Sequence, residues 1–451
     1  MDDITKLRSF ARFLIKQMVR KFGGNKELKD IDITCFMRNK FKFINDAEMT
    51  ARNNSEKNFA LMHFDINKFT VINNNVGYKI GDQILEQIAK ILQDNFLNET
   101  IGKGEGDNFF VLKEYKEQEE IFNKVLFISK KIEALSIWSK IKVNPAVKTG
   151  IVFLSKDDLD IRSAIDKALV AKKVLKNSYR SEYVIYNEEI NSNLVEVNRI
   201  VDDMHDSLEK KEFKVYYQPK IDLKTGMLTG AEALVRWEHP ELGLLYPDKF
   251  IPIFEKNGFI IKLDKYVLKE VCSNIRSWMD SGYKVVPISV NVSRIHFLCS
   301  NFADEYNKIK EESKIDSGFL EIEITESVAF SNVNVSEVFS VMKEFKNFGF
   351  KISIDDFGSG YSCLGLLKEM PIDTLKLDKM FLNNIEERNS QVIVTNIVNM
   401  AKDLNLNVVS EGVETDIQIE FLRHAGCDTA QGFIFARPEP VNDFVKLIRN
   451  H

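Results

Sequence analysis

The second half of the chain repeats one pattern, an apolar strand that ends in a polar residue and is followed by a helical segment. Glu323 and Asp355, which end two such strands, are 32 positions apart, about one strand, one helix and two loops. Eight such units close a (β/α)8 barrel, which usually takes ~250 residues, and residues 211–451 supply 241. In that fold the carboxyl ends of the strands meet at one face. We therefore expect the polar strand ends to surround a single pocket.

Seven polar side chains are predicted at that face: Glu232, Asn291, Glu323, Asp355, Asp356, Lys376 and Glu411. Carboxylate and amide oxygens are hard ligands that suit Mg²⁺ or Mn²⁺ better than zinc. Two such ions ~3.5–4 Å apart can share one carboxylate and activate a water molecule for attack on a phosphodiester. A lysine beside that water would orient it, and Arg236 is a natural phosphate clamp. Each acid alone could cap a helix or pair with a surface lysine, but the register of the whole set favours a metal site.

Length and composition exclude several other classes of protein. A chain of 451 residues is too long for one ordinary domain, and 44% hydrophobic residues suffice for two cores. The net charge of -5 gives no footprint of a nucleic-acid polymer as partner. Five scattered cysteines without a CxxC pair indicate neither a disulfide framework nor a zinc site, and they fit a reducing, cytoplasmic setting. We expect no signal peptide. We also expect no transmembrane helix, because no apolar run reaches ~18 residues.

Residues 1–30 are expected to contain a basic helix that precedes the first domain. Leu7, Phe10 and Leu14 recur at helical spacing among lysines and arginines, and Gly23 and Gly24 end the pattern. One interpretation is a helix that lies on a membrane surface or contacts a partner. The other, which we favour, is a docking or dimerising helix.

Residues 31–190 are predicted to form a mixed α/β domain. Strands are expected at 59–65, 108–112, 147–154 and 183–186, and helices at 84–92 and 164–175. A connecting helix is expected over residues 191–210, where one apolar stripe runs through Leu194, Val197, Val201, Met204 and Leu208. A helix that carries a signal between domains and a rigid spacer fit this stripe equally well.

Several ordered motifs of the second half match one known family. They are Tyr217-Gln218-Pro219-Lys220, Glu232-Ala233-Leu234-Val235-Arg236-Trp237, Asn291-Val292-Ser293, Glu323-Ile324-Thr325-Glu326-Ser327, Asp355-Asp356-Phe357-Gly358, Leu375-Lys376-Leu377-Asp378, Glu411-Gly412-Val413-Glu414 and Gln431-Gly432. Residues 197–451 thereby resemble the EAL-domain cyclic di-GMP phosphodiesterases over the whole length of that domain. The resemblance implies hydrolysis of cyclic di-GMP to linear pGpG, with two Mg²⁺ or Mn²⁺ ions per site and often a homodimer. A non-catalytic receptor that binds cyclic di-GMP or a protein partner is the alternative.

The same resemblance implies roles for individual residues. One metal ion would be held by Glu232, Asn291, Glu323 and Asp355. Asp355 would bridge to a second ion, held also by Asp356 and Glu411, and Lys376 would assist the attacking water. Substrate contacts would come from Gln218, Leu234, Arg236 and Gln431, with Asp378 as a further candidate. Glu326 and Glu414 would act from behind these residues, Glu326 by steadying the loop at 356–360.

Residues 31–190 resemble a GGDEF diguanylate cyclase domain, a nucleotide-cyclase-like α/β fold with a ferredoxin-like palm, but with a damaged signature. Asp65 matches the metal-binding acid, Asn73 and Asp82 match the guanine-reading pair, and Lys172 could reach a phosphate. The signature reads Glu105-Gly106-Asp107-Asn108-Phe109. Asp107 remains a candidate metal ligand. A carboxylate replaces glycine at Glu105, where it repels phosphate, and an amide replaces an acid at Asn108. We expect no cyclase activity. A regulatory domain that binds GTP and a structural or dimerising relic both stay open.

Overall fold

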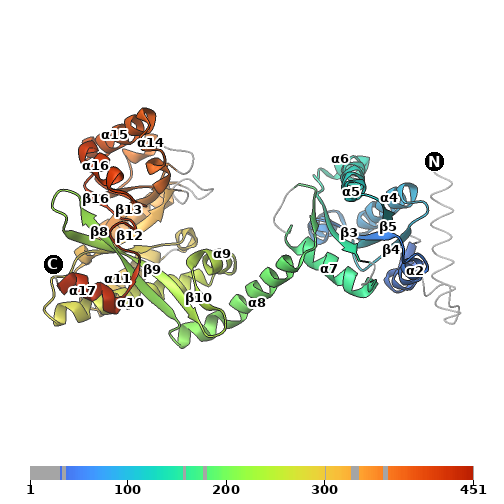
Figure 1. Ribbon diagram of the computed structural model, residues 1–451, viewed down its shortest axis with the longest axis horizontal. Helices are drawn as coiled ribbons and strands as arrows, with labels where there is room; N and C mark the ends of the chain where they lie inside the picture. Colours follow the sequence, from blue (N-terminus) through green and yellow to red (C-terminus); the bar gives the residue numbers. More distant parts are fainter. Residues whose placement is uncertain are drawn as a thin grey trace. The chain divides into compact units, whose positions relative to one another are not determined.

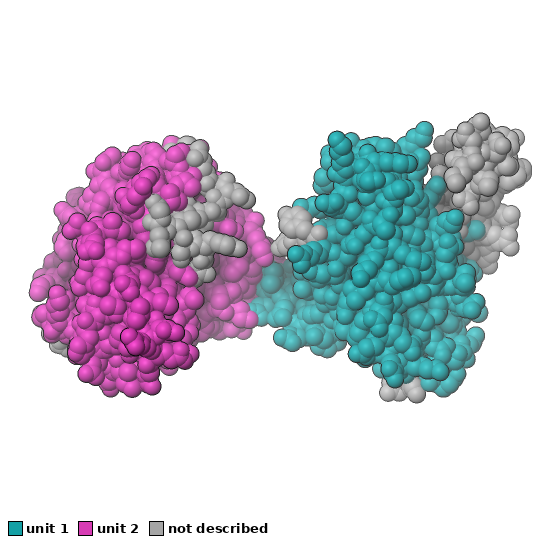
Figure 2. Space-filling view, turned by 90° about the horizontal axis from the view of Figure 1, so that it is seen from above, with its two compact units in different colours: residues 1–198 teal, residues 199–451 magenta. Residues whose placement is uncertain are grey.

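The structure is a computed structural model that describes residues 31–32, 37–155, 159–175, 180–299, 301–326, 335–358 and 364–449. The helix expected in residues 1–30 lies outside these ranges. The chain divides into two compact units, residues 1–198 and 199–451, coloured separately in Figure 2. Among the described residues, no helix combines the length and hydrophobicity that crossing a membrane requires.

The described part of the first unit is built on a seven-stranded sheet with the order β1-β2-β4-β5-β3-β6-β7 (Figure 1). Its strands are β1 (Ile31–Asp32), β2 (Met37–Asn39), β3 (Asn58–Ile66), β4 (Thr100–Lys103), β5 (Phe109–Tyr115), β6 (Val147–Leu154) and β7 (Glu182–Ile185). Its helices are α2 (Lys40–Asn53), α3 (Phe69–Val76), α4 (Tyr78–Asn95), α5 (Gln118–Glu133), α6 (Ser136–Ile141) and α7 (Ile161–Lys173). The predicted strands and helices of this domain are thus confirmed, with shifted ends.

Alternation along the central strand β3 creates a core on each face of this sheet. Ala60 and Met62 pack with apolar residues of α4 and α5, whereas Phe59 and Leu61 pack with those of α2 and α7. Successive side chains of a strand point to opposite faces of the sheet. A strand with helices on both faces therefore needs a continuous run of apolar residues.

The connecting helix α8 (Glu188–Glu209) is anchored on the second unit by its C-terminal half. Ile200 is 1% exposed and belongs to the barrel core. Asp203 accepts a hydrogen bond from Nε of Arg199 at 2.5 Å and pairs with Nε2 of the buried His239 at 3.0 Å. The helix therefore contacts β9, the strand that also carries Glu232.

The second unit is a closed barrel. Its strands, in order around the barrel, are β8 (Phe213–Asp222), β9 (Leu228–His239), β11 (Ile288–Asn291), β12 (Leu320–Thr325), β13 (Lys351–Phe357), β14 (Thr374–Leu377), β15 (Asn407–Ser410) and β16 (Thr429–Ala430). Closure occurs because β8 pairs with both β9 and β16. Two short strands, β10 (Gly243–Leu245) and β17 (Glu439–Pro440), pair with β9 and β8.

Helices surround this barrel (Figure 1). They are α9 (Pro247–Asn257), α10 (Ile260–Asp280), α11 (Phe302–Glu312), α13 (Val335–Asn347), α14 (Leu364–Leu367), α15 (Arg388–Asp403), α16 (Asp416–Ala425) and α17 (Val441–Arg449), with the 3-10 helices η2 (Arg294–Leu298), η3 (Ser317–Phe319) and η4 (Lys379–Leu382). The predicted α/β barrel is thereby confirmed.

One strand departs from the regular strand-then-helix repeat that the sequence suggested. β8 runs antiparallel to both of its neighbours, whereas the strands from β9 to β16 are parallel. The cause is the short connection from β8 to β9. There the Asp222 side chain accepts hydrogen bonds from the backbone N–H groups of Lys224 and Thr225 at 3.0 and 2.7 Å. Such a tight turn joins antiparallel strands, since a parallel pair needs a long crossover.

Candidate metal centre and substrate site

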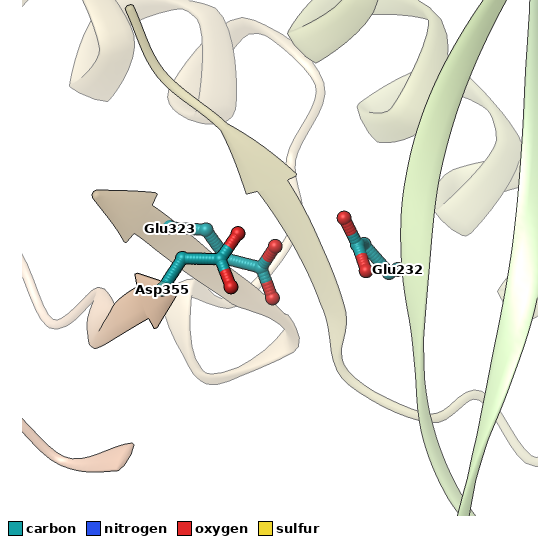
Figure 3. A group of neighbouring side chains, drawn as sticks. All are labelled: Glu232, Glu323 and Asp355. Carbon is teal, nitrogen blue, oxygen red and sulfur yellow. The ribbon is translucent and has the colours of Figure 1, made fainter. Parts of the chain in front are cut away.

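Two overlapping groups of carboxylates lie at the carboxyl ends of the barrel strands. In the first group, Glu232, Glu323 and Asp355 are buried, and each offers an oxygen within 4.8 Å of the others. Figure 3 shows these three carboxylates turned toward a common space. In the second group, Asp356 and Glu411 join Asp355 within the same distance. Asp355 therefore belongs to both groups, which is the arrangement that a bridging ligand requires.

Strand pairing explains why residues far apart in the sequence meet here. Neighbouring parallel strands place Asn291 opposite Glu323 and Thr325 opposite Asp355. Asn291 also donates a hydrogen bond from Nδ2 to Oε1 of Glu232 at 2.7 Å. The predicted amide ligand thus lies beside the first carboxylate group.

A bulge in β13 lets two consecutive aspartates face the same site. In a regular strand, neighbouring side chains point to opposite faces. Here the pairing with β14 shifts between Ile354 and Phe357, so that Asp355 and Asp356 together stand opposite Lys376. Asp356 adopts a left-handed backbone with φ of 53°, a conformation that aspartate tolerates better than most residues. Its N–H donates to Oδ1 of Asp355 at 2.9 Å.

Lys376 lies at the centre of both carboxylate groups and is fully buried. Its Nζ is 2.5 Å from Glu411, 2.9 Å from Glu323, 3.1 Å from Asp355 and 3.5 Å from Glu232. Burial alone would lower the pKa of Lys376, but the charges of Glu232 and Glu323 foremost raise it well above its ordinary value. The side chain is therefore a fixed cation at neutral pH.

Lys220, to which the sequence analysis gave no role, is a second buried cation in the barrel. Its Nζ donates to Oε1 of Glu323 at 2.9 Å and to Oγ of Ser289 at 2.8 Å. Desolvation lowers its pKa, but the charges of Glu323 and Glu321 outweigh this effect and raise it. The sequence contained one indication that Lys220 lies near the site: it follows Gln218 by two residues on β8, so both side chains are on the same face of the strand.

The cluster contains more acidic than basic side chains. Five carboxylates, those of Glu232, Glu323, Asp355, Asp356 and Glu411, surround the two lysines. Burial, followed by the charges of Asp355 and Asp378, raises the pKa of Asp356 to about 6. Burial also raises the pKa of Glu411 to about 8, although Lys376 opposes this shift. Divalent cations that prefer oxygen ligands would offset this surplus, so the donor set fits Mg²⁺ or Mn²⁺.

The predicted substrate residues of β9 share the face of Glu232. Leu234 and Arg236 follow at alternate positions of the strand. The guanidinium carbon of the buried Arg236 lies 5.1 Å from the ring centre of Tyr246 and 5.9 Å from that of Tyr216. Cation–π contacts with two rings hold this candidate phosphate clamp in place.

Two predicted glutamines contact each other beside the first carboxylate group. Nε2 of Gln431 donates to Oε2 of Glu232 at 2.7 Å and to Oε1 of Gln218 at 3.0 Å. Gln218 in turn donates to the backbone oxygen of Ala436 at 3.2 Å. The buried Oε1 of Gln431 has no hydrogen-bond partner within the described ranges, so it is available as an acceptor.

Three further predicted residues take different positions. Asp378 lies close enough to Asp356 to raise its pKa. Glu326 is 2% exposed and accepts a hydrogen bond from the N–H of Gly358 at 2.7 Å. Glu414 is exposed before α16, where its backbone N–H donates to Oε1 of Gln418 at 2.8 Å.

The predicted residues of the first unit fall into two places. Lys172 is paired with Asp65, and Asp107 shares a hydrogen bond with the same carboxylate. Burial, then this hydrogen bond, raises the pKa of Asp107 to about 8. Asn73 lies elsewhere in the domain, directly against Gly81: a Cβ added at Gly81 would be 2.0 Å from Oδ1 of Asn73. The next residue, Asp82, is exposed.

A closed α/β barrel with overlapping carboxylate groups around a buried lysine places this protein among the α/β barrels that carry a candidate acidic metal centre at the strand ends. More particularly, the chain belongs to the EAL-domain family, because residues 201–438 match the family described as EAL domain. Residues 30–182 match the family described as diguanylate cyclase, GGDEF domain. The chain is therefore a tandem GGDEF-EAL protein related to cyclic di-GMP phosphodiesterases.

Similar curated proteins align with most of this chain, and a similar solved structure aligns with about half of it. The chain is 32% identical over 395 residues to the bifunctional diguanylate cyclase/cyclic di-GMP phosphodiesterase MucR of Pseudomonas aeruginosa, covering 87% of this chain and 57% of MucR. It is 29% identical over 404 residues to the cyclic di-GMP phosphodiesterase PdeR of Escherichia coli, covering 89% of this chain and 60% of PdeR. Thus the chain spans little more than half the length of these curated relatives. A solved structure, the PaMucR phosphodiesterase in complex with c-di-GMP, is 37% identical with a TM-score of 0.52, covering 55% of this chain and 99% of that one.

Proposed function

We propose that the barrel domain hydrolyses cyclic di-GMP to linear pGpG with two divalent metal ions, Mg²⁺ or Mn²⁺. The observation that carries this proposal is the place of Asp355 in both carboxylate groups, because a shared carboxylate can hold two ions ~3.5–4 Å apart. The names of PdeR and of the PaMucR complex support the choice of substrate.

The residues of the barrel would have separate roles in binding metal, activating water and binding substrate. Glu232, Asn291, Glu323 and Asp355 would hold one ion, and Asp355, Asp356 and Glu411 the other. When bound, the two ions would supply Lewis acidity to the phosphate and lower the pKa of the attacking water. Lys376 would orient that water and stabilise the charge that develops on phosphate. Substrate would be bound by Gln218, Leu234, Arg236, Asp378 and Gln431. Glu326 would support the loop after Asp356, and Glu414 would have a supporting role from its exposed position before α16.

We propose further that the first domain makes no cyclic di-GMP. Glu105 places an exposed carboxylate in the signature loop, and Asn108 carries an amide where the family pattern has an acid. If Asn73 and Asp82 still read guanine, GTP will change the rate of the barrel domain. If the domain is a structural or dimerising relic, GTP will neither bind nor alter that rate.

The test incubates the purified full chain with cyclic di-GMP and either Mg²⁺ or Mn²⁺, with and without GTP, and separates the products by chromatography. We expect pGpG from the wild type and none from Glu232→Ala, which lacks a metal ligand. Glu238→Ala is the matched control, because Glu238 is exposed on the same strand. Bound cyclic di-GMP without product would instead identify a receptor, and full activity of Glu232→Ala would show that the reaction occurs elsewhere.

A further inference from the structure

The acidic site of the first domain contains a cation supplied by the chain itself. Nζ of Lys172, near the end of α7, forms an ion pair with Oδ2 of Asp65, at the end of β3, and lies 3.4 Å from Oδ1 of Asn108. The Lys172 and Asp65 side chains are only 16% and 21% exposed. Charges so far removed from water are costly unless they are paired, so this contact satisfies both groups.

The other oxygens that could hold a metal ion here also have protein partners. Oδ2 of Asp107 accepts the N–H of Ile66 at 3.0 Å, and its carboxyl group shares a hydrogen bond with Asp65. Oδ1 of Asn108 lies 2.8 Å from Nε2 of the buried His63. Burial, then the charge of Lys172, lowers the pKa of His63 to about 4, so the ring is neutral at neutral pH and Nε2 is the donor.

The signature loop is fixed from its other side as well. Nδ2 of Asn108 donates to the backbone oxygen of Glu105 at 2.6 Å, which sets the orientation of the amide. The ammonium of Lys103 donates to the backbone oxygens of Gly104, at 3.0 Å, and of Gly106. Protein groups therefore hold the signature loop on both of its sides.

We propose that the ammonium of Lys172 takes the place of the metal ion that the GGDEF resemblance implies, so that the first domain binds no divalent cation at Asp65. A metal ion would have to displace a cation that is tethered to the chain and so has a high local concentration. If it bound without displacing Lys172, it would lie beside a positive charge. The signature also supplies only one acid at this site, Asp107, since Asn108 carries a neutral amide. This inference concerns a site other than the barrel centre.

The test counts bound Mn²⁺ per full-length chain by electron paramagnetic resonance at a fixed free concentration. Four proteins are compared: the wild type, Asp65→Asn, Lys172→Met and the double variant. The barrel sites contribute equally to all four, so only differences matter. We expect equal counts for the wild type and Asp65→Asn. Lys172→Met should bind at least one further ion, which the added Asp65→Asn substitution removes.

Lys173→Met is the matched control, because Lys173 is the exposed neighbour on the same helix, and its count should equal that of the wild type. Circular dichroism and phosphodiesterase rate report on folding. A lower count in Asp65→Asn than in the wild type would overturn the proposal, and so would a folded Lys172→Met protein without a further ion. If Lys172→Met does not fold, Lys172→Gln replaces it. The Mn²⁺ counts of the wild type and Asp65→Asn then still test whether an ion binds at Asp65.

Discussion

Nζ of Lys220 lies 2.9 Å from Oε1 of Glu323, and the other oxygen of the same carboxylate lies 2.9 Å from Nζ of Lys376. Each oxygen of Glu323 thus has its own ammonium partner. Burial raises the pKa of this glutamate, but Lys220 and Lys376 outweigh burial and hold its pKa well below the usual value. Glu323 is therefore anionic and fixed in orientation, as a pre-organised ligand should be.

Replacing Lys220 with methionine should weaken the barrel site without touching its predicted ligands. The substitution keeps most of the volume but leaves Glu323 with one cation and removes the hydrogen bond from Lys220 to Ser289. Groups that orient a metal ligand typically contribute about 10–100-fold in metal affinity or activity. We expect a loss of this size in kcat, together with a higher Mn²⁺ dissociation constant by titration calorimetry. Lys220→Arg should restore part of both.

Lys224→Met is the control for this experiment, since Lys224 is exposed in the turn that follows the same strand. If Lys220 contributed only to stability, Lys220→Met would have a lower thermal midpoint but the same Mn²⁺ dissociation constant as the wild type. That result would remove Lys220 from the metal centre.

Asp355→Asn and Asp356→Asn should differ in the number of metal ions that remain bound. Asp355 belongs to both carboxylate groups, whereas Asp356 belongs only to the second. We expect the Asp355 variant to lose both ions and the Asp356 variant to lose one. Both should lose at least about 100-fold in kcat, because two-ion catalysis needs both sites filled. Mn²⁺ counting at equilibrium measures the difference. Equal counts in the two variants would contradict a bridging role for Asp355.

The arrangement of strands was predictable because it depends on local patterns. Apolar runs that end in acids indicated parallel strands, and parallel strands bring their carboxyl ends together. The antiparallel course of β8 was not predictable in this way, because it depends on the tight turn at Asp222. Nor was the bulge at Asp355 and Asp356, since a sequence pattern with period two places two adjacent acids on opposite faces.

Two paired lysines, Lys172 and Lys220, mark a second limit of sequence reasoning. Lys172 was named only as a residue that could reach a phosphate, and its pairing with Asp65, 107 positions away, was not foreseen. Lys220 received no role, although it pairs with Glu323, 103 positions away. Partners this distant are set by the fold, so residue type and spacing alone do not reveal them.

Three cysteines should differ sharply in reactivity. Burial raises the pKa of the Cys272 and Cys427 thiols to about 12, whereas Cys299 is exposed. Because only the thiolate reacts with iodoacetamide, a thiol of that pKa is almost wholly unreactive near pH 8. We expect peptide mass spectrometry to find alkylation at Cys299 in the folded protein, and at Cys272 and Cys427 only after guanidinium is added. Equal labelling of Cys427 and Cys299 before unfolding would contradict this assignment.

The hydrogen bond from the N–H of Gly358 to Glu326 should affect activity because it fixes the end of β13, the strand that carries Asp355 and Asp356. Gly358 has φ of 92°, and a Cβ added there would lie 2.2 Å from Cζ of Phe381. Gly358→Ala therefore combines backbone strain, about 1–3 kcal/mol, with a steric clash two residues after Asp356. Glu326→Ala leaves a partly buried N–H without its partner, which costs about 1–3 kcal/mol. We expect each variant to lose about 10-fold or more in kcat.

A matched glycine separates this effect from strain alone. Gly226 has φ of 73°, but no atom lies within 4 Å of an added Cβ, and it lies in the exposed turn between β8 and β9. Because Gly226→Ala introduces similar backbone strain without a clash, we expect it to lower the thermal midpoint but to leave kcat unchanged. Glu326→Gln, which keeps an acceptor oxygen, should retain more activity than Glu326→Ala. Wild-type kcat in Gly358→Ala would show that the backbone after Asp356 does not position the second carboxylate group.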